Sequence, residues 1–284
     1  MMANLLNYIV WDPDPILFHL GPIALRYYAT CWLVGLLLGY LLMQRLYRQQ
    51  KIGDEKFEPL FIYIFIGILA GARLGHCLFY QPEYFLSQWD HVVEMLIPMH
   101  HLPDGSWKFT GYEGLASHGG VIGMFVAIWL YCRNLKVKGW VVLDNMGICS
   151  GIAAAFIRIG NLMNSEIIGM VTDVPWAFIF VKEDQYPRHP GQLYEAIAYL
   201  IIFLLIFFIY KKKGPKSVGS GLYFGLCLTL IFTFRFFIEY TKEIQVAFEA
   251  GLPMDMGQIL SIPLILLGVW SIASSFRRAK KIQA

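Results

Sequence analysis

The amino-acid sequence predicts an all-α integral membrane protein with seven transmembrane helices. Three observations support this fold class. Of the 284 residues, 57% are hydrophobic and only 15% are charged, and seven separate stretches each approach the roughly 20 apolar residues that a spanning helix needs. A soluble globular protein carries about 25% charged residues. The composition therefore excludes a soluble enzyme, a disordered chain and a collagen-like fibre.

The seven predicted helices follow one another along the chain. They cover residues 23–44, 59–80, 115–132, 140–163, 192–210, 219–239 and 257–276. Outside them we expect a short outer arm at residues 1–22 and outer loop elements at residues 81–114 and 164–191. All of these belong, in this interpretation, to one transmembrane domain of residues 1–284.

The basic residues predict the orientation of the helices. Fifteen of the 23 lysines and arginines fall in the segments that follow the first, third, fifth and seventh predicted helices. The opposite segments hold Lys108, Lys182, Arg188 and Lys242. Because cytoplasmic loops are enriched in Lys and Arg, we expect the N-terminus outside and the C-terminus in the cytoplasm.

Four arginines remain, all within the predicted helices and near their outer ends. They are Arg26, Arg73, Arg158 and Arg235. A single arginine near a helix end can simply extend to the membrane interface, but four on one side weaken that explanation. A guanidinium binds phosphate bidentately and stays charged when partly buried. We therefore predict that this cluster holds a lipid phosphate.

A polar string ends the fourth predicted helix. Between Arg158 and Gly169 lie two amides (Asn161 and Asn164), a hydroxyl (Ser165) and a carboxylate (Glu166). Backbone that leaves a helix within the bilayer is tolerated only where it is buried in protein or lines a cavity. A simple helix cap would need one Gly or Asn, so the string indicates a site for phosphate and glycerol oxygens.

A second motif, Ser117–Gly120, opens the third predicted helix with the sequence Ser-His-Gly-Gly. A neutral imidazole such as that of His118 can take a proton from a nucleophile near neutral pH. A hydrogen-bonded packing histidine is an equally good explanation. The four-residue spacing of Gly67, Gly71 and Gly75 is typical of close helix packing.

Acidic residues accompany the arginines. Glu239 follows Arg235 by four residues, so the two can form an ion pair on one helix face. For Glu239 and Asp144 we expect mainly structural roles as counter-ions, because a buried arginine needs a partner. The five cysteines lie in apolar stretches without a CxxC pair, and no clustered ligands predict a metal.

At these residues the sequence resembles the bacterial phosphatidylglycerol–prolipoprotein diacylglyceryl transferases. The string from Arg158 to Gly169 is similar to the signature of that family. Further matches are Leu25–Tyr28, Gly71–Gly75, His118–Gly120, Asp144, His189–Glu195, Arg235 with Phe236 and Glu239, and Met256–Ser261. The resemblance extends over residues 15–275.

The resemblance implies a multi-pass enzyme of the bacterial cytoplasmic (inner) membrane, with its active site toward the periplasm. Such an enzyme transfers the diacylglyceryl group of phosphatidylglycerol to the lipobox cysteine of a prolipoprotein and releases glycerol-1-phosphate. We expect catalytic roles for His118, Arg158 and Arg235. The expected substrate-binding residues are Tyr28, Arg73, Gly119, Arg158, Asn161, Asn164, Glu166, Gly169 and Glu239. Where the family carries a tyrosine one turn before the arginine of the sixth helix, this chain has Ile231.

The expected partners are phosphatidylglycerol, the prolipoprotein signal peptide with its lipobox cysteine, and the lipid bilayer, with no nucleic acid. No cofactor is expected, because the lipid itself carries the transferred group. A membrane transporter for an anionic solute is the alternative, although its site would lie near the midplane between internal repeats. A signalling receptor with seven helices would not need the polar string.

Overall fold

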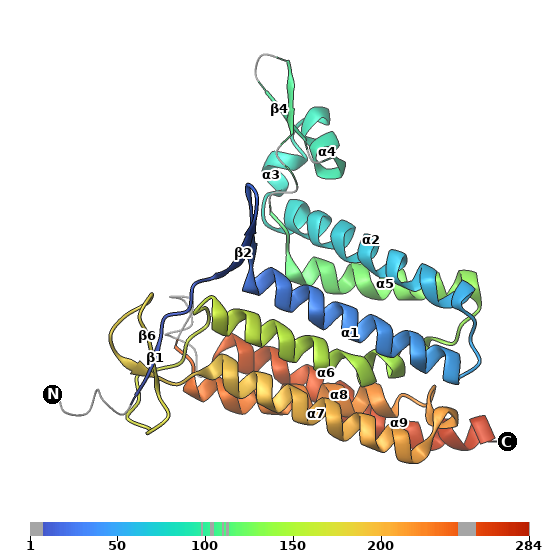
Figure 1. The fold of residues 1–284 in the computed structure, drawn as a ribbon. Helices are drawn as coiled ribbons and strands as arrows, with labels where there is room; N and C mark the ends of the chain where they lie inside the picture. Colours follow the sequence, from blue (N-terminus) through green and yellow to red (C-terminus); the bar gives the residue numbers. More distant parts are fainter. Residues whose placement is uncertain are drawn as a thin grey trace. The chain divides into compact units, whose positions relative to one another are not determined.

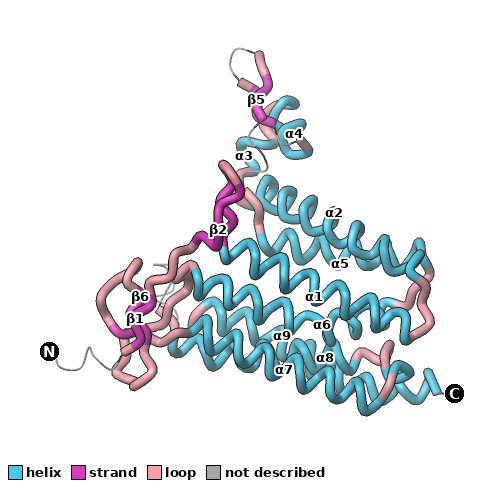
Figure 2. Tube along the Cα trace, viewed as in Figure 1, coloured by secondary structure: helices cyan, strands magenta, loops and turns pink. Residues whose placement is uncertain are grey.

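The computed structural model describes residues 8–97, 99–102, 105–109, 111, 114–243 and 254–283. The chain is mostly helical, as Figures 1 and 2 show. It divides into two compact units. The first unit combines residues 1–50 with residues 143–284, and the second consists of residues 51–142.

The first unit contains five long helices and a small sheet. Its elements are β1 (Ile9–Trp11), β2 (Ile16–Leu20), β3 (Ile23–Arg26), α1 (Tyr27–Gln49), most of α6 (Gly139–Met163), β6 (Phe178–Phe180), β7 (Pro187–Arg188), α7 (Gly191–Lys213), η2 (Pro215–Ser217), α8 (Leu222–Ile238), η3 (Glu239–Thr241) and α9 (Met256–Gln283). The second unit holds α2 (Asp54–Phe79), α3 (Pro82–Phe85), α4 (Trp89–Leu96), β4 (Met99–His101), β5 (Trp107–Phe109) and α5 (Ser117–Leu135).

Each predicted span corresponds to a long helix, and six of the helices in the described residues are long and apolar enough to cross a membrane: α1, α2, α6, α7, α8 and α9. The helix outside that set is α5, which has 19 residues. It begins with Ser117 and His118 and carries Arg133 and Asn134 in its last turn. The structure thus supports an all-α membrane protein with six candidate spans, and α5 remains a predicted seventh.

The predicted start of the first helix at residue 23 is wrong. Residues Ile23–Arg26 form strand β3, which pairs antiparallel with β2, and α1 starts only at Tyr27. Gly21 allows the hairpin turn because its φ of 59° lies in the left-handed region that glycine adopts readily. Apolar composition alone did not separate this strand from the helix, and Arg26 therefore precedes the first helix.

The small sheet of the first unit anchors the segment that follows α6. Strand β1 pairs in parallel with β6, and β6 pairs antiparallel with β7. The indole Nε1 of Trp11 donates to the carbonyl of Leu162 at 2.9 Å, and Leu162 packs with Phe178 and Phe180 in one buried cluster. The N-terminal segment thereby fixes the end of α6, where the polar string begins.

Asp144 organises the other end of the first unit. Its fully buried carboxylate accepts hydrogen bonds from the backbone N–H groups of Gly219 (2.8 Å), Gly221 (2.9 Å) and Phe224 (3.0 Å). Phe224 lies in the first turn of α8, where backbone N–H groups have no partner within the helix. Asp144 is thus structural as expected, but its hydrogen-bond partners are backbone amides at a helix start.

In the second unit, α2 and α5 pack closely through glycines. A Cβ added to Gly71 would lie 2.7 Å from the Cα of Gly123, and one added to Gly75 would lie 2.8 Å from the Cα of Gly119. Real Cβ atoms do not approach other atoms so closely, so these positions need glycine. The predicted helix-packing role of the glycine ridge is confirmed.

Candidate functional site

The polar string after α6 folds into a compact turn. The backbone N–H of Glu166 donates to the carbonyl of Asn161 at 3.0 Å. Ser165 and Ile167 adopt φ angles of 59° and 58°, which non-glycine residues rarely adopt. Such conformations persist only where the surroundings enforce them, so the turn holds its side chains in a defined arrangement.

Four side chains of the string form one hydrogen-bonded group. The amides of Asn161 and Asn164 donate to the two carboxylate oxygens of Glu166, at 3.0 and 2.9 Å. The Oδ1 atom of Asn161 accepts a hydrogen bond from Arg158 at 3.3 Å. The Gln192 side chain donates to the Glu166 carbonyl from the start of α7. The Asn161 amide thereby links Glu166 to the Arg158 guanidinium.

Arg158 also belongs to a chain of alternating charges inside the first unit. Its Nε atom lies 3.1 Å from Oε2 of Glu195 on α7. The other oxygen of that carboxylate, Oε1, lies 3.2 Å from Nζ of Lys242 and accepts a hydrogen bond from Tyr199 at 3.1 Å. Glu195 is fully buried, and a buried carboxylate needs such partners to remain ionised.

The chain of charges continues to Arg235. Nζ of Lys242 lies 3.1 Å from Oε1 of Glu239, and the same oxygen lies 3.5 Å from Nε of Arg235. The ion pair predicted from the four-residue spacing of Arg235 and Glu239 is therefore present. Gly257 at the start of α9 packs on Glu239, since a Cβ there would lie 2.9 Å from Cγ of Glu239.

Arg158 and Arg235, at the two ends of this series of charges, line the same cavity. Its volume is about 210 Å³. Its lining residues are Arg158, Ile167, Arg235, Glu239, Lys242, Glu243, Asp255, Met256, Gly257 and Leu260. Segments far apart in the sequence thus bring two guanidinium groups to one space, an arrangement suited to binding a phosphate.

The sequence alone did not identify two members of this cluster. Lys242 was counted only as one basic residue of an outer segment, and Glu195 was named only as the last residue of the matching segment His189–Glu195. The sequence signal that could have pointed to Glu195 is its charge, because an ionisable residue in an apolar helix requires a partner. The identity of that partner depends on the packing of α7 against α8.

Gly169 and Tyr28 contact the string in different ways. A Cβ on Gly169 would lie 2.5 Å from the carbonyl oxygen of His189 and 2.7 Å from that of Thr241. The Tyr28 ring lies against Gly160, where an added Cβ would be 3.0 Å from Cδ2 of Tyr28. Tyr28 therefore borders α6 between Arg158 and Asn161, whereas Gly169 permits a close approach of backbone segments.

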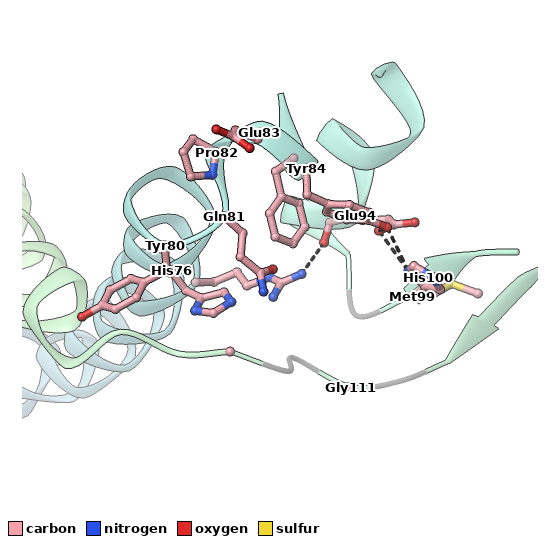
Figure 3. A pocket seen from close by; sticks show the side chains of 13 residues that line it. His76, Tyr80, Gln81, Pro82, Glu83, Tyr84, Glu94, Met99, His100 and Gly111 are labelled. Atoms are coloured by element: carbon pink, nitrogen blue, oxygen red, sulfur yellow. Dashed lines mark hydrogen bonds and ion pairs between the residues drawn. The ribbon is translucent and has the colours of Figure 1, made fainter. Parts of the chain in front are cut away.

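In the second unit, Arg73 lies at the end of α2. Its NH2 group donates to the backbone carbonyl of Glu94 at 2.9 Å, and its guanidinium lies 5.0 Å from the ring centroid of Phe85. It lines a cavity of about 970 Å³ together with His76, Tyr84, His100 and others. Figure 3 shows Glu94 and His100 on one side of this cavity and His76 toward α2. Arg73 thus joins the end of α2 to α3 and α4.

The Glu94 carboxylate is a buried acceptor beside that cavity. It accepts hydrogen bonds from the Tyr84 hydroxyl at 2.9 Å and the His101 backbone N–H at 2.6 Å, and it contacts Nδ1 of His100 at 3.1 Å. Burial by itself raises the pKa of Glu94, but these hydrogen bonds outweigh it and lower the pKa below the ordinary value. Burial and the nearby carboxylate raise the pKa of Tyr84 to about 12.

His118 and Gly119 also lie in the second unit. His118 is exposed in the first turn of α5, whereas Gly119 is buried and faces Gly71 and Gly75 of α2. Among the residues that the structure describes, no group of three or more His, Cys, Asp or Glu side chains is arranged to hold a metal ion.

The family model for prolipoprotein diacylglyceryl transferases matches residues 15–274 of the chain. The chain belongs to this family. A phosphatidylglycerol–prolipoprotein diacylglyceryl transferase of Bacteroides fragilis is 55% identical over 95% of this chain and 96% of its own length. Transferases of the same name from Tolumonas auensis and Vibrio cholerae are 45% and 34% identical, covering 92% and 93% of this chain and 95% and 92% of their own lengths.

The structure gathers part of the residue set that the family resemblance suggested. In the first unit, Arg158, Asn161, Asn164 and Glu166 form one hydrogen-bonded group, and Arg235 and Glu239 join Arg158 through Lys242 and Glu195. In this transferase-family chain the string is therefore one part of a larger ionic cluster. His118, Gly119 and Arg73 belong to the second unit.

Proposed function

We propose that the chain transfers the diacylglyceryl group of phosphatidylglycerol to the lipobox cysteine of prolipoproteins, and that the ionic cluster of the first unit binds the lipid headgroup. Membership in the transferase family supports the reaction. One structural observation carries the assignment of the site: Arg158 and Arg235 line one cavity. Two guanidinium groups match a phosphodiester in charge and in hydrogen-bond geometry.

The arginines have a second task during the reaction. The bond between the glyceryl carbon and its phosphate oxygen breaks, and its electron pair leaves with glycerol-1-phosphate while a carbon–sulfur bond forms. Negative charge therefore accumulates on the departing phosphate. Fixed positive groups aimed at developing charge are usually the largest contribution to catalysis, and Arg158 and Arg235 supply it. Asn161, Asn164 and Glu166 orient Arg158 and hold glycerol hydroxyls.

The attacking group is the thiolate of the substrate cysteine, because the thiol itself is a poor nucleophile. His118 takes the thiol proton in this proposal, since a neutral imidazole is the side chain suited to this transfer near pH 7. Its exposed position in the first turn of α5 leaves the ring accessible. The alternative needs no base, because the positive field of the arginines can lower the pKa of the thiol.

The distribution of basic residues supports a position in the bacterial cytoplasmic membrane with the arginine cluster on the outer side. In this proposal α5 is the seventh span, and the elements between residues 81 and 114 and between 164 and 191 lie outside. Phosphatidylglycerol then enters from the outer leaflet. Lipobox cysteines reach the same side when signal peptides insert in the membrane.

A transfer assay tests the function. Purified full-length chain incubated with phosphatidylglycerol and a lipobox peptide should add the mass of one diacylglyceryl group to the peptide. A folded preparation that leaves the peptide mass unchanged would favour the transporter for an anionic solute. The names of the relatives favour transfer over transport.

Single variants test the proposed roles of Arg158 in stabilising the departing phosphate and of His118 as the base. Arg158→Ala should lower the transfer rate by at least about 10²-fold, in the range seen when a charge-stabilising donor is removed. Arg277→Ala, at an exposed position, serves as the control.

His118→Gln should slow transfer about 10²-fold at neutral pH. Recovery of its rate at high pH would assign thiol deprotonation to His118, and full activity at neutral pH would remove His118 from the mechanism.

A further inference from the structure

Lys242 is a buried charged side chain that the proposed reaction does not use. Its side chain is only 5% exposed, and its Nζ lies 3.2 Å from Glu195 and 3.1 Å from Glu239. A buried ammonium is costly unless it is fully paired. Its presence between two carboxylates, in the chain of contacts that joins the arginines, calls for a functional explanation.

The backbone of Lys242 is as constrained as its side chain. Lys242 pairs with Gly169 in an isolated β-bridge, and its N–H donates to the Glu239 carbonyl at 3.0 Å. The N–H of Met170 donates to the Thr241 carbonyl at 2.8 Å. The segment after α6 therefore holds Lys242 in place, which connects the polar string to the end of α8.

Both arginines meet their carboxylates through Nε. Arg158 uses Nε toward Glu195 at 3.1 Å, and Arg235 uses Nε toward Glu239 at 3.5 Å. Each carboxylate thereby contacts the Nε atom of a guanidinium, and the NH1 nitrogen of Arg158 donates instead to Oδ1 of Asn161. Lys242 contacts the other oxygen of Glu195 and shares Oε1 of Glu239 with Arg235, so its charge offsets both carboxylates and weakens their hold on the arginines.

The charges around the cavity make the same point. Its lining includes the cations Arg158, Arg235 and Lys242 and the acids Glu239, Glu243 and Asp255. Glu243 is 55% exposed and is paired with Arg188. Because Glu243 is paired with Arg188, the charges left without Lys242 would be the carboxylates of Glu239, Asp255 and the adjoining Glu195 against two arginines, and a phosphate monoanion would meet a net negative environment. A single buried charge changes the binding of a phosphate strongly, because charges in a buried site are only weakly screened.

We infer that Lys242 is a positioning and specificity-determining residue: it neutralises Glu195 and Glu239 so that Arg158 and Arg235 remain available to an anionic phosphodiester headgroup. The inference rests on the proposed function, because it assumes that the lipid phosphate binds at these arginines. It assigns to Lys242 the preference for an anionic lipid over a zwitterionic one.

Rate measurements on the full-length chain in detergent micelles test this role. Lys242→Met keeps the length of the side chain but removes its charge, Lys242→Arg keeps the charge, and Lys108→Met changes an exposed lysine of β5 as a control. Initial rates are measured against phosphatidylglycerol with a lipobox peptide, and phosphatidylethanolamine with the same acyl chains serves as competitor.

For Lys242→Met we expect the KM for phosphatidylglycerol to rise about tenfold or more, with kcat falling less than about threefold, as for a lost binding interaction. The advantage of phosphatidylglycerol over phosphatidylethanolamine should fall by a similar factor. Lys242→Arg should restore both values to within about threefold, and Lys108→Met should leave them unchanged.

Outcomes that contradict the role of Lys242 can be told apart from failure of the proposed function. If the proposed function fails, the wild-type chain itself is inactive. An active wild type whose Lys242→Met variant keeps its KM and its lipid preference would overturn the inference. If Lys242→Met does not fold, Lys242→Gln replaces it, because its amide can still donate to one carboxylate. Loss of folding in both variants, with a folded Lys242→Arg, would assign Lys242 to stability and also overturn the inference.

Discussion

At the scale of single residues, Gly169 illustrates how one missing side chain organises the site. Its N–H donates to the His189 carbonyl at 3.0 Å, and its own carbonyl accepts from Arg188 at 3.1 Å. Together with the bridge to Lys242, these contacts join the string, the start of α7 and the end of α8. The motif glycine therefore has a packing role that supports the charged cluster.

We predict that Gly169→Ala disrupts this junction. A Cβ there would lie 2.5 Å from the His189 carbonyl oxygen, and overpacking of this kind costs about 1–3 kcal/mol. The added Cβ would also lie 2.7 Å from the Thr241 carbonyl oxygen. It would therefore displace the segment that carries Lys242, and transfer activity should fall by at least about tenfold. The control is Gly39→Ala in α1, where no atom lies within 4 Å of the added Cβ. Equal activity and melting temperature of the two variants would contradict the packing role.

At the scale of elements, the charged cluster depends on helix ends that meet. Arg158 comes from the last turns of α6, Glu195 from the start of α7, and Arg235 from the end of α8. Each of these helices contributes one charge to the cluster, and Glu239 and Lys242 follow the end of α8. The partners become neighbours only because α6, α7 and α8 bring these ends together in the first unit.

The contact between α2 and α5 is a testable property of the second unit. We predict that Gly71→Ala forces these helices apart, since its Cβ would lie 2.7 Å from the Cα of Gly123, at a cost of about 1–3 kcal/mol. Gly120→Ala should be tolerated, because its nearest contacts would be 3.5 Å away. Thermal unfolding in detergent gives the comparison, and equal melting temperatures would contradict the close packing of the two helices.

The cluster around Glu94 predicts a pH dependence of stability for the elements beyond α2. The pKa of Glu94 in the folded chain lies below its ordinary value of 4.5. Its ionised form therefore stabilises the fold fully above the pKa of the unfolded chain, and this contribution is lost as the pH falls through the lower folded pKa.

Hydrogen exchange of residues 84–101 measures this contribution. Protection should decline between about pH 5 and pH 3 in the wild type and more weakly in Glu94→Gln, because that variant has no carboxylate to protonate. Glu83→Gln changes an exposed acid nearby and should behave like the wild type. A wild-type decline that Glu94→Gln fails to reduce would exclude Glu94 as its source.

At the scale of the whole molecule, the central question is how often the chain crosses the membrane. Six helices qualify as spans by length and composition, whereas the alternation of basic segments predicts seven crossings. The difference is α5, whose polar first turn carries His118. If α5 spans the membrane, the segments before and after it lie on opposite sides.

Cysteine labelling distinguishes the two topologies. Lys108→Cys, before α5, should react with a membrane-impermeant maleimide in cells whose outer membrane is permeabilised and whose cytoplasmic membrane is intact. Lys136→Cys, after α5, should react only after the cytoplasmic membrane is also permeabilised. Lys182→Cys and Lys212→Cys bracket α7 and provide the reference for opposite sides. Reaction of positions 108 and 136 from the same side would remove α5 from the spans and reverse the expected orientation of one half of the chain.

Much of this protein could be predicted from the sequence because its signals are local. Apolar runs identified the long helices, the asymmetry of basic residues gave an expected orientation, and the string from Arg158 to Glu166 indicated a polar site at a helix end. The i,i+4 pair of Arg235 and Glu239 follows from helix geometry alone. Each of these inferences needs only a few consecutive turns of chain.

Tertiary structure decided what depends on distant segments. The strand at Ile23–Arg26 exists because it pairs with β2, a contact that composition does not encode. Lys242 and Glu195 are 47 residues apart and meet at 3.2 Å, and only the packing of the helices makes that ion pair possible. The sequence by itself determined that arginines and carboxylates lie within or next to apolar helices, where each of them needs a partner of opposite charge. The fold decided which charges neutralise one another, because Coulombic interactions in a buried site depend on distances in space.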